Sequence, residues 1–133
     1  SDQNQFILTM TEPTQNTYRP ISCILDGSNY VLWSRHITSH LKAKMLWKYV
    51  IGTSSQPSRL AAESEIKFAK REEQWDCKNG ELMSYFYSTT TTEINQQFVR
   101  FDTGKEIWDF LKARYTTTDL AHQYQLWSAL HGK

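Results

Sequence analysis

The sequence predicts an all-α protein, a compact bundle of five or six helices with an extended N-terminal arm. Apolar residues recur at spacings of three and four along most of the chain, which is the period of an amphipathic helix. Turn-forming and capping residues separate these stretches, and strand-like alternation is almost absent. Aromatic residues make up 14% of the 133 residues and include five Trp, which is enough to build a core.

Residues 1–20 are predicted to form the arm, because the Asp, Asn, Thr and Pro residues there disfavour a helix. Phe6, Ile7 and Leu8 make a lone apolar patch within it. The patch either folds back on its own domain or docks on a neighbouring molecule, and the second alternative makes it a self-association site. Deleting residues 1–12 and measuring the oligomeric mass separates the two, since an unchanged mass argues against docking.

The helical domain is predicted to span residues 21–133. It opens with a short apolar run, 21–25, which is either a strand or a buried extended lead-in. An Asp-Gly pair then predicts a turn, and Ser28 or Asn29 can cap the helix expected over 28–44. The buried face of this helix is predicted to carry Tyr30, Trp33, Ile37 and Leu41.

Residues 45–51 either continue the first helix or form a second short one, which Gly52 ends. A loop is expected over 53–58, followed by a long helix over 59–88. The pair Asn79-Gly80 weakens this helix and is expected to break or kink it. One broad apolar face is predicted to contain Leu60, Phe68, Trp75, Leu82 and Phe86.

The third part of the chain begins with a short helix predicted over 93–99. Thr103 and Glu106 then fit a capping box, in which each side chain satisfies a backbone amide at the start of the next helix. A turn with a new cap is expected at 116–119, and Gly132 is placed to end a last helix. The apolar faces of these two helices are predicted to contain Ile107, Trp108, Phe110, Leu111 and Tyr115, and then Leu120, Tyr124, Trp127 and Leu130.

Composition restricts the classes of protein to consider. The formal net charge is +1, so no global field favours nucleic acid or a membrane surface. Cys23 and Cys77 are far apart and lack a CxxC partner, which indicates neither a zinc site nor a disulfide framework and favours a reducing, cytoplasmic location. No apolar run approaches the roughly 20 residues that a membrane span needs, so no membrane partner is expected.

No catalytic centre is predicted. The sequence has no G-x-S-x-G motif, no glycine-rich phosphate loop and no catalytic cysteine motif, so an enzyme and a cofactor are not expected. His36 and His40 have the i,i+4 spacing of two zinc ligands, but they lack the intervening Glu and a third ligand. Lys44 and Lys48 continue the same row, which favours a solvated helix face over a metal site.

A local basic stretch is the candidate RNA contact. It is free of Asp and Glu, and Trp47 and Tyr49 lie beside it as possible stacking platforms. The alternative is an ordinary solvated helix face, with Trp47 in the core. The four cations of this stretch are Arg35, Lys42, Lys44 and Lys48.

Two blocks of sequence carry a resemblance. The first is residues 25–34, LDGSNYVLWS, followed by LKAK at 41–44; the second is Trp75, then FDTGKEIWDFL at 101–111, then Tyr115. In this order and spacing they resemble the N-terminal Gag region of copia-type LTR retrotransposons, especially those of plants. That family typically reads L-x-G-x-N-Y-x-x-W, then a W-x-x-x-(D/N) helix, then A-K-E-I-W-x-x-L-x-x-x-Y. This chain departs from the pattern with a Gly in place of the Ala.

The resemblance implies a structural protein without catalytic residues, similar in role to the N-terminal lobe of a retroviral capsid. Such a Gag self-associates into a particle that encloses RNA, either for a live element or in a host protein derived from one. We expect this chain by itself to associate weakly, as a monomer or dimer. The resemblance places most motif residues in the core and assigns Gly27 to the turn. The motif residues are Leu25, Gly27, Asn29, Tyr30, Trp33, Trp75, Ile107, Trp108, Leu111 and Tyr115.

Two other functions stay open on the sequence. The first is a nucleic-acid-binding module, which would bind RNA through the basic stretch with a steep dependence on salt. The second is a domesticated adaptor that binds a host peptide in an apolar groove between helices. An aromatic-lined, solvent-exposed groove, or one filled by residues 6–10, favours the adaptor.

Overall fold

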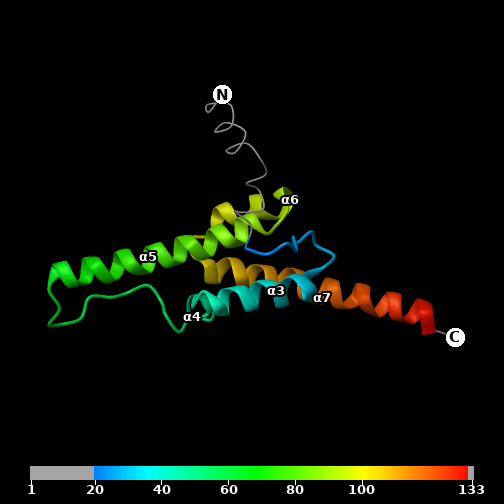
Figure 1. Cartoon of the computed structure of the whole chain (residues 1–133), viewed down its shortest axis with the longest axis horizontal. Helices are drawn as coiled ribbons and strands as arrows, with labels where there is room; N and C mark the ends of the chain where they lie inside the picture. The colour runs from blue at the N-terminus through cyan, green and yellow to red at the C-terminus, as the bar shows by residue number, and fades with distance from the viewer. Residues whose placement is uncertain (1–19, 132–133) are drawn as a thin grey trace, which may run out of the picture.

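The computed structural model describes residues 20–131, except for the side chains of 118–120 and 122–123, and it confirms the all-α prediction. The predicted arm, with Phe6, Ile7 and Leu8, lies outside the described residues apart from Pro20. The described elements are all helical (Figure 1). They are α3 (Tyr30–Ala43), α4 (Trp47–Val50), α5 (Glu65–Ser88), α6 (Thr92–Asn95), the 3-10 helix η1 (Gln96–Arg100) and α7 (Gly104–His131).

The core lies where α3, α4 and the second half of α5 pack on the first half of α7. Helices α3 and α7 run antiparallel, because Gly27 lies next to Tyr115 whereas Gly52, further along the chain, lies next to Lys105. The two motif blocks of the sequence therefore face each other. The buried apolar side chains are Leu25, Tyr30, Trp33, Ile37, Leu41, Leu46, Val50, Leu82, Phe86, Ile94, Phe98, Ile107 and Leu111.

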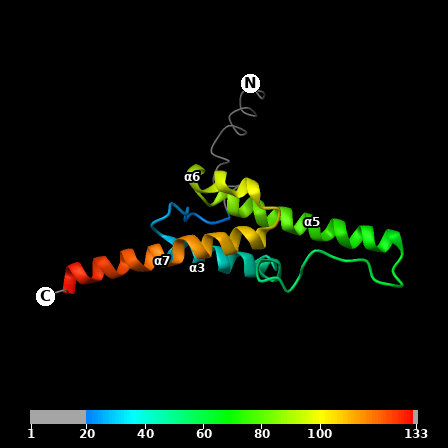
Figure 2. The same ribbon diagram turned by 180° about the vertical axis from the view of Figure 1, so that it is seen from behind.

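Two helices extend beyond this core in opposite directions. The N-terminal half of α5 projects from one end of the molecule, and the C-terminal half of α7 projects from the other (Figures 1 and 2). These projecting halves bury little: Ile66 on α5 and Leu130 on α7 are both more than 70% exposed. The packed part of the fold is thus shorter than its longest helices.

The turn before α3 is held by a local network. Gly27 has a φ of +100°, a conformation that glycine adopts without steric cost. Asp26 Oδ1 accepts hydrogen bonds from both the amide and the hydroxyl of Ser28, at 2.8 and 2.7 Å. Asn29 is the residue before α3, but its side chain does not cap the helix. It turns back instead, accepting from the Asp26 amide and donating to Ile24 O at 2.9 Å.

The lead-in at 21–25 forms no strand. Leu25 makes one isolated parallel bridge with Thr90, in which the Leu25 amide donates to Thr89 O at 2.8 Å and the Thr91 amide donates to Leu25 O at 3.0 Å. These bonds satisfy the backbone of a fully buried leucine. They also attach the start of the domain to the connection between α5 and α6.

The long helix begins later than predicted, at Glu65 instead of residue 59. Ser64 is the cap, and its hydroxyl accepts from the Lys67 amide at 3.2 Å. The preceding residues cannot extend the helix because the Glu63 carboxylate accepts from the Leu60 amide and holds a turn there. Leu60 is consequently outside the helix and 63% exposed, so its predicted place on the apolar face is wrong.

The predicted break at Asn79-Gly80 is also wrong, because α5 continues through both residues. Asn79 is buried, and its side chain bonds to the start of α7 instead of competing for its own backbone. Its Oδ1 accepts from the Gly104 amide at 2.8 Å, and its Nδ2 donates to Asp102 O at 3.0 Å. These bonds give the polar side chain a role in joining two helices and offset its poor helix propensity.

Helix α7 starts at the predicted capping box and continues past its predicted end. Thr103 Oγ1 accepts from the Glu106 amide at 3.1 Å, as predicted. The Glu106 carboxylate accepts from the Thr103 hydroxyl at 3.0 Å instead of from the predicted backbone amide. The turn predicted at 116–119 is wrong, since one helix runs from Gly104 to His131. Threonine and aspartate each cost only about 0.7 kcal/mol in a helix, and no Gly or Pro lies there to end it.

Candidate functional site

A groove between α3 and α7 is the candidate functional site. Its volume is about 500 Å³. The α3 wall follows from helical spacing, because residues three and four apart fall on one side of the helix. Val31, Ser34, Arg35 and Thr38 line the groove in this way, with Ser39 at the end of the row.

The opposite wall is a single row on α7. Trp108, Lys112 and Thr116 follow one another at intervals of four residues and all line the groove. Eight residues of α-helix rise about 12 Å, so the row is about 12 Å long. Tyr30 closes the groove where the two helices approach, and burial raises the pKa of its phenol, which therefore stays neutral at physiological pH.

The charge lining the groove is positive. Arg35 and Lys112 are both exposed, and no carboxylate lines the groove with them. Neither cation forms an ion pair within the described part of the chain. The nearest acid on α7 in sequence is Asp109, whose carboxylate is bound by Lys105 at 2.6 Å. The groove thus presents two uncompensated cations to solvent.

Trp108 connects the groove to the core. It is half-buried, and its ring centre lies 6.1 Å from that of Trp33 and 6.1 Å, stacked, from that of Phe86. Trp47 meets it edge-on at 5.5 Å. Aromatic contacts of this kind fix the orientation of a ring. The exposed part of Trp108 is consequently a rigid surface within the groove.

The structure brings one of the four predicted RNA-contact cations into the groove. Of these four, Arg35 lines the groove. Lys42 Nζ lies 5.5 Å from the centre of the Trp47 ring, and Lys48 Nζ lies 5.5 Å from the centre of the ring of the next residue, Tyr49. Lys44 is the residue after α3 and is exposed. The sequence reasoning missed Lys112, whose only signal is its position four residues after the motif tryptophan.

The motif residues are placed in three ways. Leu25, Tyr30, Trp33, Ile107 and Leu111 are buried in the core. Gly27 and Asn29 form the turn before α3, and an added Cβ on Gly27 would touch Tyr115 at 3.6 Å. Trp108 and Tyr115 are half-buried and pack against the core, and Trp75 is half-buried on α5. Trp75 donates its indole N–H to Ser54 O at 3.1 Å and so holds the loop before α5.

The two histidines differ in environment. His36 is exposed, whereas His40 Nε2 is buried without a hydrogen-bond partner, and the His40 ring lies edge-on to Tyr85 at 5.1 Å. Burial, together with the charge of Lys44, lowers the pKa of His40. Within residues 20–131 there is no group of three or more His, Cys, Asp or Glu side chains that could hold a metal ion.

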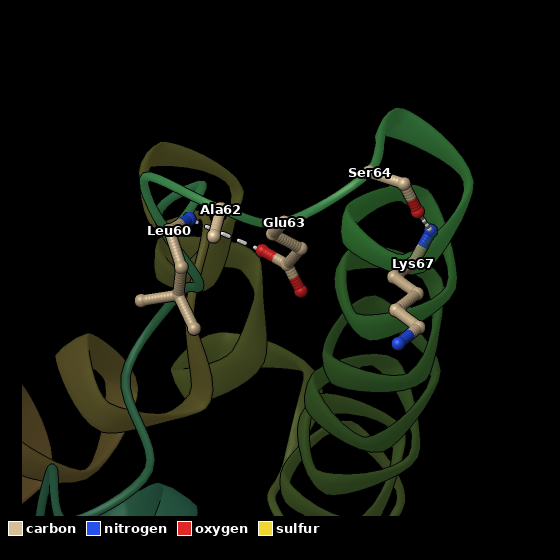
Figure 3. A pocket seen from close by; sticks show the side chains of 5 residues that line it. All are labelled: Leu60, Ala62, Glu63, Ser64 and Lys67. Atoms are coloured by element: carbon tan, nitrogen blue, oxygen red, sulfur yellow. Dashed lines mark hydrogen bonds between the residues drawn. The ribbon is translucent and has the colours of Figure 1, made fainter.

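A second cavity, of about 400 Å³, lies where the chain enters α5 (Figure 3). Leu60, Ala62, Glu63, Ser64 and Lys67 line it. Two of its polar side chains are already engaged, since Glu63 accepts from the Leu60 amide and Ser64 accepts from the Lys67 amide. The cavity therefore offers fewer unused polar groups than the α3–α7 groove.

Arg71 makes the stability of the segment just before α5, residues 59–64, depend on pH. Hydrogen bonds from Arg71 at 2.6 and 2.7 Å, with the Leu60 amide, lower the pKa of Glu63 to about 2 from an ordinary value of 4.5. Because the folded pKa is depressed, the stabilisation is present above about pH 4.5 and is lost as the pH falls through about 2. We expect an NMR titration of the Glu63 carboxyl to show a midpoint near 2.

The matched variant Glu63→Gln removes the charge and keeps the shape of the side chain. Amide hydrogen exchange at residues 59–64 should then be faster than in the wild type at pH 6 and should lose its extra acid dependence below pH 4.5. A carboxyl midpoint near 4.5 in the wild type would contradict the ion pair with Arg71.

A family model described as a domain of unknown function (DUF4219) matches residues 25–51. The matched segment contains the turn at Gly27, helix α3 and helix α4, and so includes the α3 wall of the groove. No curated protein and no solved structure matches the chain. No helix in residues 20–131 is long and apolar enough to cross a membrane.

Proposed function

We propose that this chain is a Gag-type structural protein of a copia-like retrotransposon, or of a host protein derived from one, that self-associates into a particle containing RNA. The DUF4219 match at residues 25–51 supports this reading, because that domain is typical of retrotransposon Gag-like regions. A non-catalytic building block also accords with a site that offers cations, hydroxyls and aromatic surface.

The packing of the two motif blocks adds support. The Gag pattern pairs an early N-Y-x-x-W segment with a late I-W-x-x-L segment. Here Tyr30 and Trp33 of the first segment lie 6.5 and 6.1 Å from Trp108 of the second, measured between ring centres. The resemblance therefore covers one structural interface, formed by residues that are more than 70 positions apart in the sequence.

The observation that carries the self-association proposal is the apolar surface of the projecting half of α7. Trp127 is 58% exposed and Leu130 is 81% exposed, and Tyr124 and Leu126 lie within one turn of them. Trp127 also stacks on His131 at 4.8 Å, which presents a flat aromatic surface. Exposed apolar residues that gather on one segment favour a contact with another protein surface.

A second copy of this chain is the proposed occupant of that surface. A shell is stable when many copies each make small contacts, so a weak pairwise interaction is sufficient for assembly. Because α7 projects away from the core, two copies can bring these ends together without displacing the packed helices (Figure 2). The apolar patch of Phe6, Ile7 and Leu8 is a second proposed contact, outside the described residues.

Sedimentation over a range of protein concentrations tests the proposal. We expect the wild-type chain to shift from monomer toward dimer or larger species as its concentration rises toward the millimolar range. Leu130→Glu should weaken this association by about tenfold or more, because a charge replaces an apolar contact that must be desolvated. Ile66→Glu is the matched control, since Ile66 is also exposed but lies on the other projecting helix.

A wild-type chain that stays monomeric at millimolar concentration would argue against an assembly role for this domain alone. Equal effects of Leu130→Glu and Ile66→Glu would instead show that the apolar surface of α7 is not the specific contact. Deleting residues 1–12 in the same experiment tests the arm, and an unchanged mass would exclude Phe6, Ile7 and Leu8 as an intermolecular contact.

A further inference from the structure

The α3–α7 groove combines features that the packing of the domain does not require. Arg35 and Lys112 stand on opposite walls, and neither has an ion-pair partner in the described part of the chain. By contrast, Arg71 is paired with Glu63, and Lys105 is paired with Asp109. Two unpaired cations across a groove, with no carboxylate lining it, favour an anionic ligand.

The remaining lining narrows the ligand class. Thr38 and Ser39 place hydroxyls on the α3 wall, whereas the hydroxyl oxygen of Thr116 on the α7 wall is buried. Hydroxyl and cationic donors are the groups that bind phosphate oxygens in proteins. Tyr30 and Trp108 supply an aromatic part of the lining, which suits the apolar surface of a base or sugar. Phosphate and base surfaces occur together in a nucleotide.

We propose that the α3–α7 groove binds a short segment of single-stranded RNA, with phosphates between Arg35 and Lys112 and a base or sugar against Trp108. The groove is about 12 Å long and about 500 Å³ in volume, so it can hold a short segment of a single nucleic-acid strand. A duplex keeps its bases stacked inside, so its base surfaces cannot reach Trp108. A single strand can place both groups in the groove.

The choice of RNA over another single strand rests on the proposed Gag function, whereas the groove chemistry fits any single-stranded nucleic acid. The two proposals fail in different experiments. Sedimentation without nucleic acid reports on self-association, and binding of an oligonucleotide at protein concentrations where the chain is monomeric reports on the groove. A chain that stays monomeric but still binds RNA through the groove would contradict the proposed particle assembly without contradicting the proposed binding site.

Fluorescence anisotropy with a labelled 12-nucleotide oligo(U) tests the site. We expect Arg35→Glu/Lys112→Glu to bind at least about tenfold more weakly than the wild type at low salt. Each phosphate contact contributes about 0.7 to the slope of log affinity against log salt for a single strand, so losing two contacts should reduce the slope by about 1.4. Both residues are exposed, and Arg35→Gln/Lys112→Gln provides a second variant that introduces no new charge.

Lys67→Glu/Lys70→Glu is the matched control. It makes the same change in net charge at two exposed positions on the projecting half of α5, away from the groove. We expect this variant to keep most of the affinity of the wild type and its salt slope. An equal loss in both double variants would show that binding follows net charge alone and would overturn the groove site.

NMR of the tryptophan indole N–H groups tests the contact with Trp108 separately from the attraction between opposite charges. Titration with oligo(U) should shift the Trp108 signal, because its ring lines the groove. The Trp75 signal should stay unchanged, since that indole N–H donates to Ser54 O in a different part of the fold. Binding that leaves the Trp108 signal in place would overturn the contact with the aromatic lining.

The form of the nucleic acid is resolved by three further probes: UMP, oligo(dT) of 12 nucleotides and a 12-base-pair RNA duplex. We expect the duplex and UMP to bind much more weakly than oligo(U), because the first hides its bases and the second spans one phosphate. A duplex or UMP that binds as tightly as oligo(U) would overturn the single-strand proposal. Tighter binding of oligo(dT) than of oligo(U) would overturn the assignment to RNA.

Discussion

Trp33→Ala is expected to lower the free energy of unfolding by about 3–5 kcal/mol, the range for truncating a buried tryptophan or phenylalanine. Trp33 is fully buried, and its ring centre lies 5.9 Å from Tyr30 and 6.2 Å from Phe86. With Trp108, these contacts join α3 to α5 and α7. Urea denaturation followed by helical circular dichroism measures the loss, which is a large share of the stability of an ordinary domain.

Trp33→Phe is the informative partner variant. The Trp33 indole N–H is buried without a hydrogen-bond partner, and an unpaired buried donor is itself costly. Phenylalanine keeps an aromatic ring and removes that donor, so we expect a loss of less than about 2 kcal/mol. A loss as large as that of Trp33→Ala would show that the full indole shape, and not apolar burial, is what the site requires.

Gly104→Ala should destabilise the fold by about 3 kcal/mol, because the site is already filled. A Cβ added at Gly104 would lie 2.5 Å from Leu82 Cγ and closer still to one of its methyl groups. The backbone cannot move away freely, since the Gly104 amide donates to Asn79 Oδ1 at 2.8 Å. The expected cost comes from the contact between the added Cβ and Leu82.

A double-mutant cycle with Leu82 tests that explanation. Leu82→Ala alone should cost about 2–5 kcal/mol through the cavity it leaves. Combined with Gly104→Ala, it removes the clashing atoms, and the double variant should be more stable than the sum of the single losses by more than about 1 kcal/mol. Additive losses in urea denaturation would mean that Gly104→Ala acts through something other than Leu82.

The parts of the fold that depend on local chemistry could be predicted from the sequence. Thr103 and Glu106 are three residues apart, so the capping box that opens α7 is visible in the sequence itself. The apolar spacing of Trp33, Ile37 and Leu41 likewise gives the buried face of α3. Each of these features involves residues less than about three turns apart, where helix geometry alone sets the contacts.

Some errors arose where a distant partner decides the outcome, and others where local signals compete. Asn79 reads as a helix breaker until it is paired with Gly104, which lies 25 residues away. The groove needs both Arg35 and Lys112, and only the antiparallel packing of α3 on α7 brings them to one site. The start of α5 depended on competing local signals, and Ser64 with the turn at Glu63 prevailed over helical periodicity.

The antiparallel packing of α3 on α7 has a consequence for the order in which the protein folds during synthesis. Part of the apolar side of α3 stays uncovered until the segment containing Trp108 has left the ribosome. Contacts between residues so far apart in the chain form slowly and leave apolar surface open in the meantime. The segment that the family model matches therefore supplies one side of an interface whose other side is made about 70 residues later.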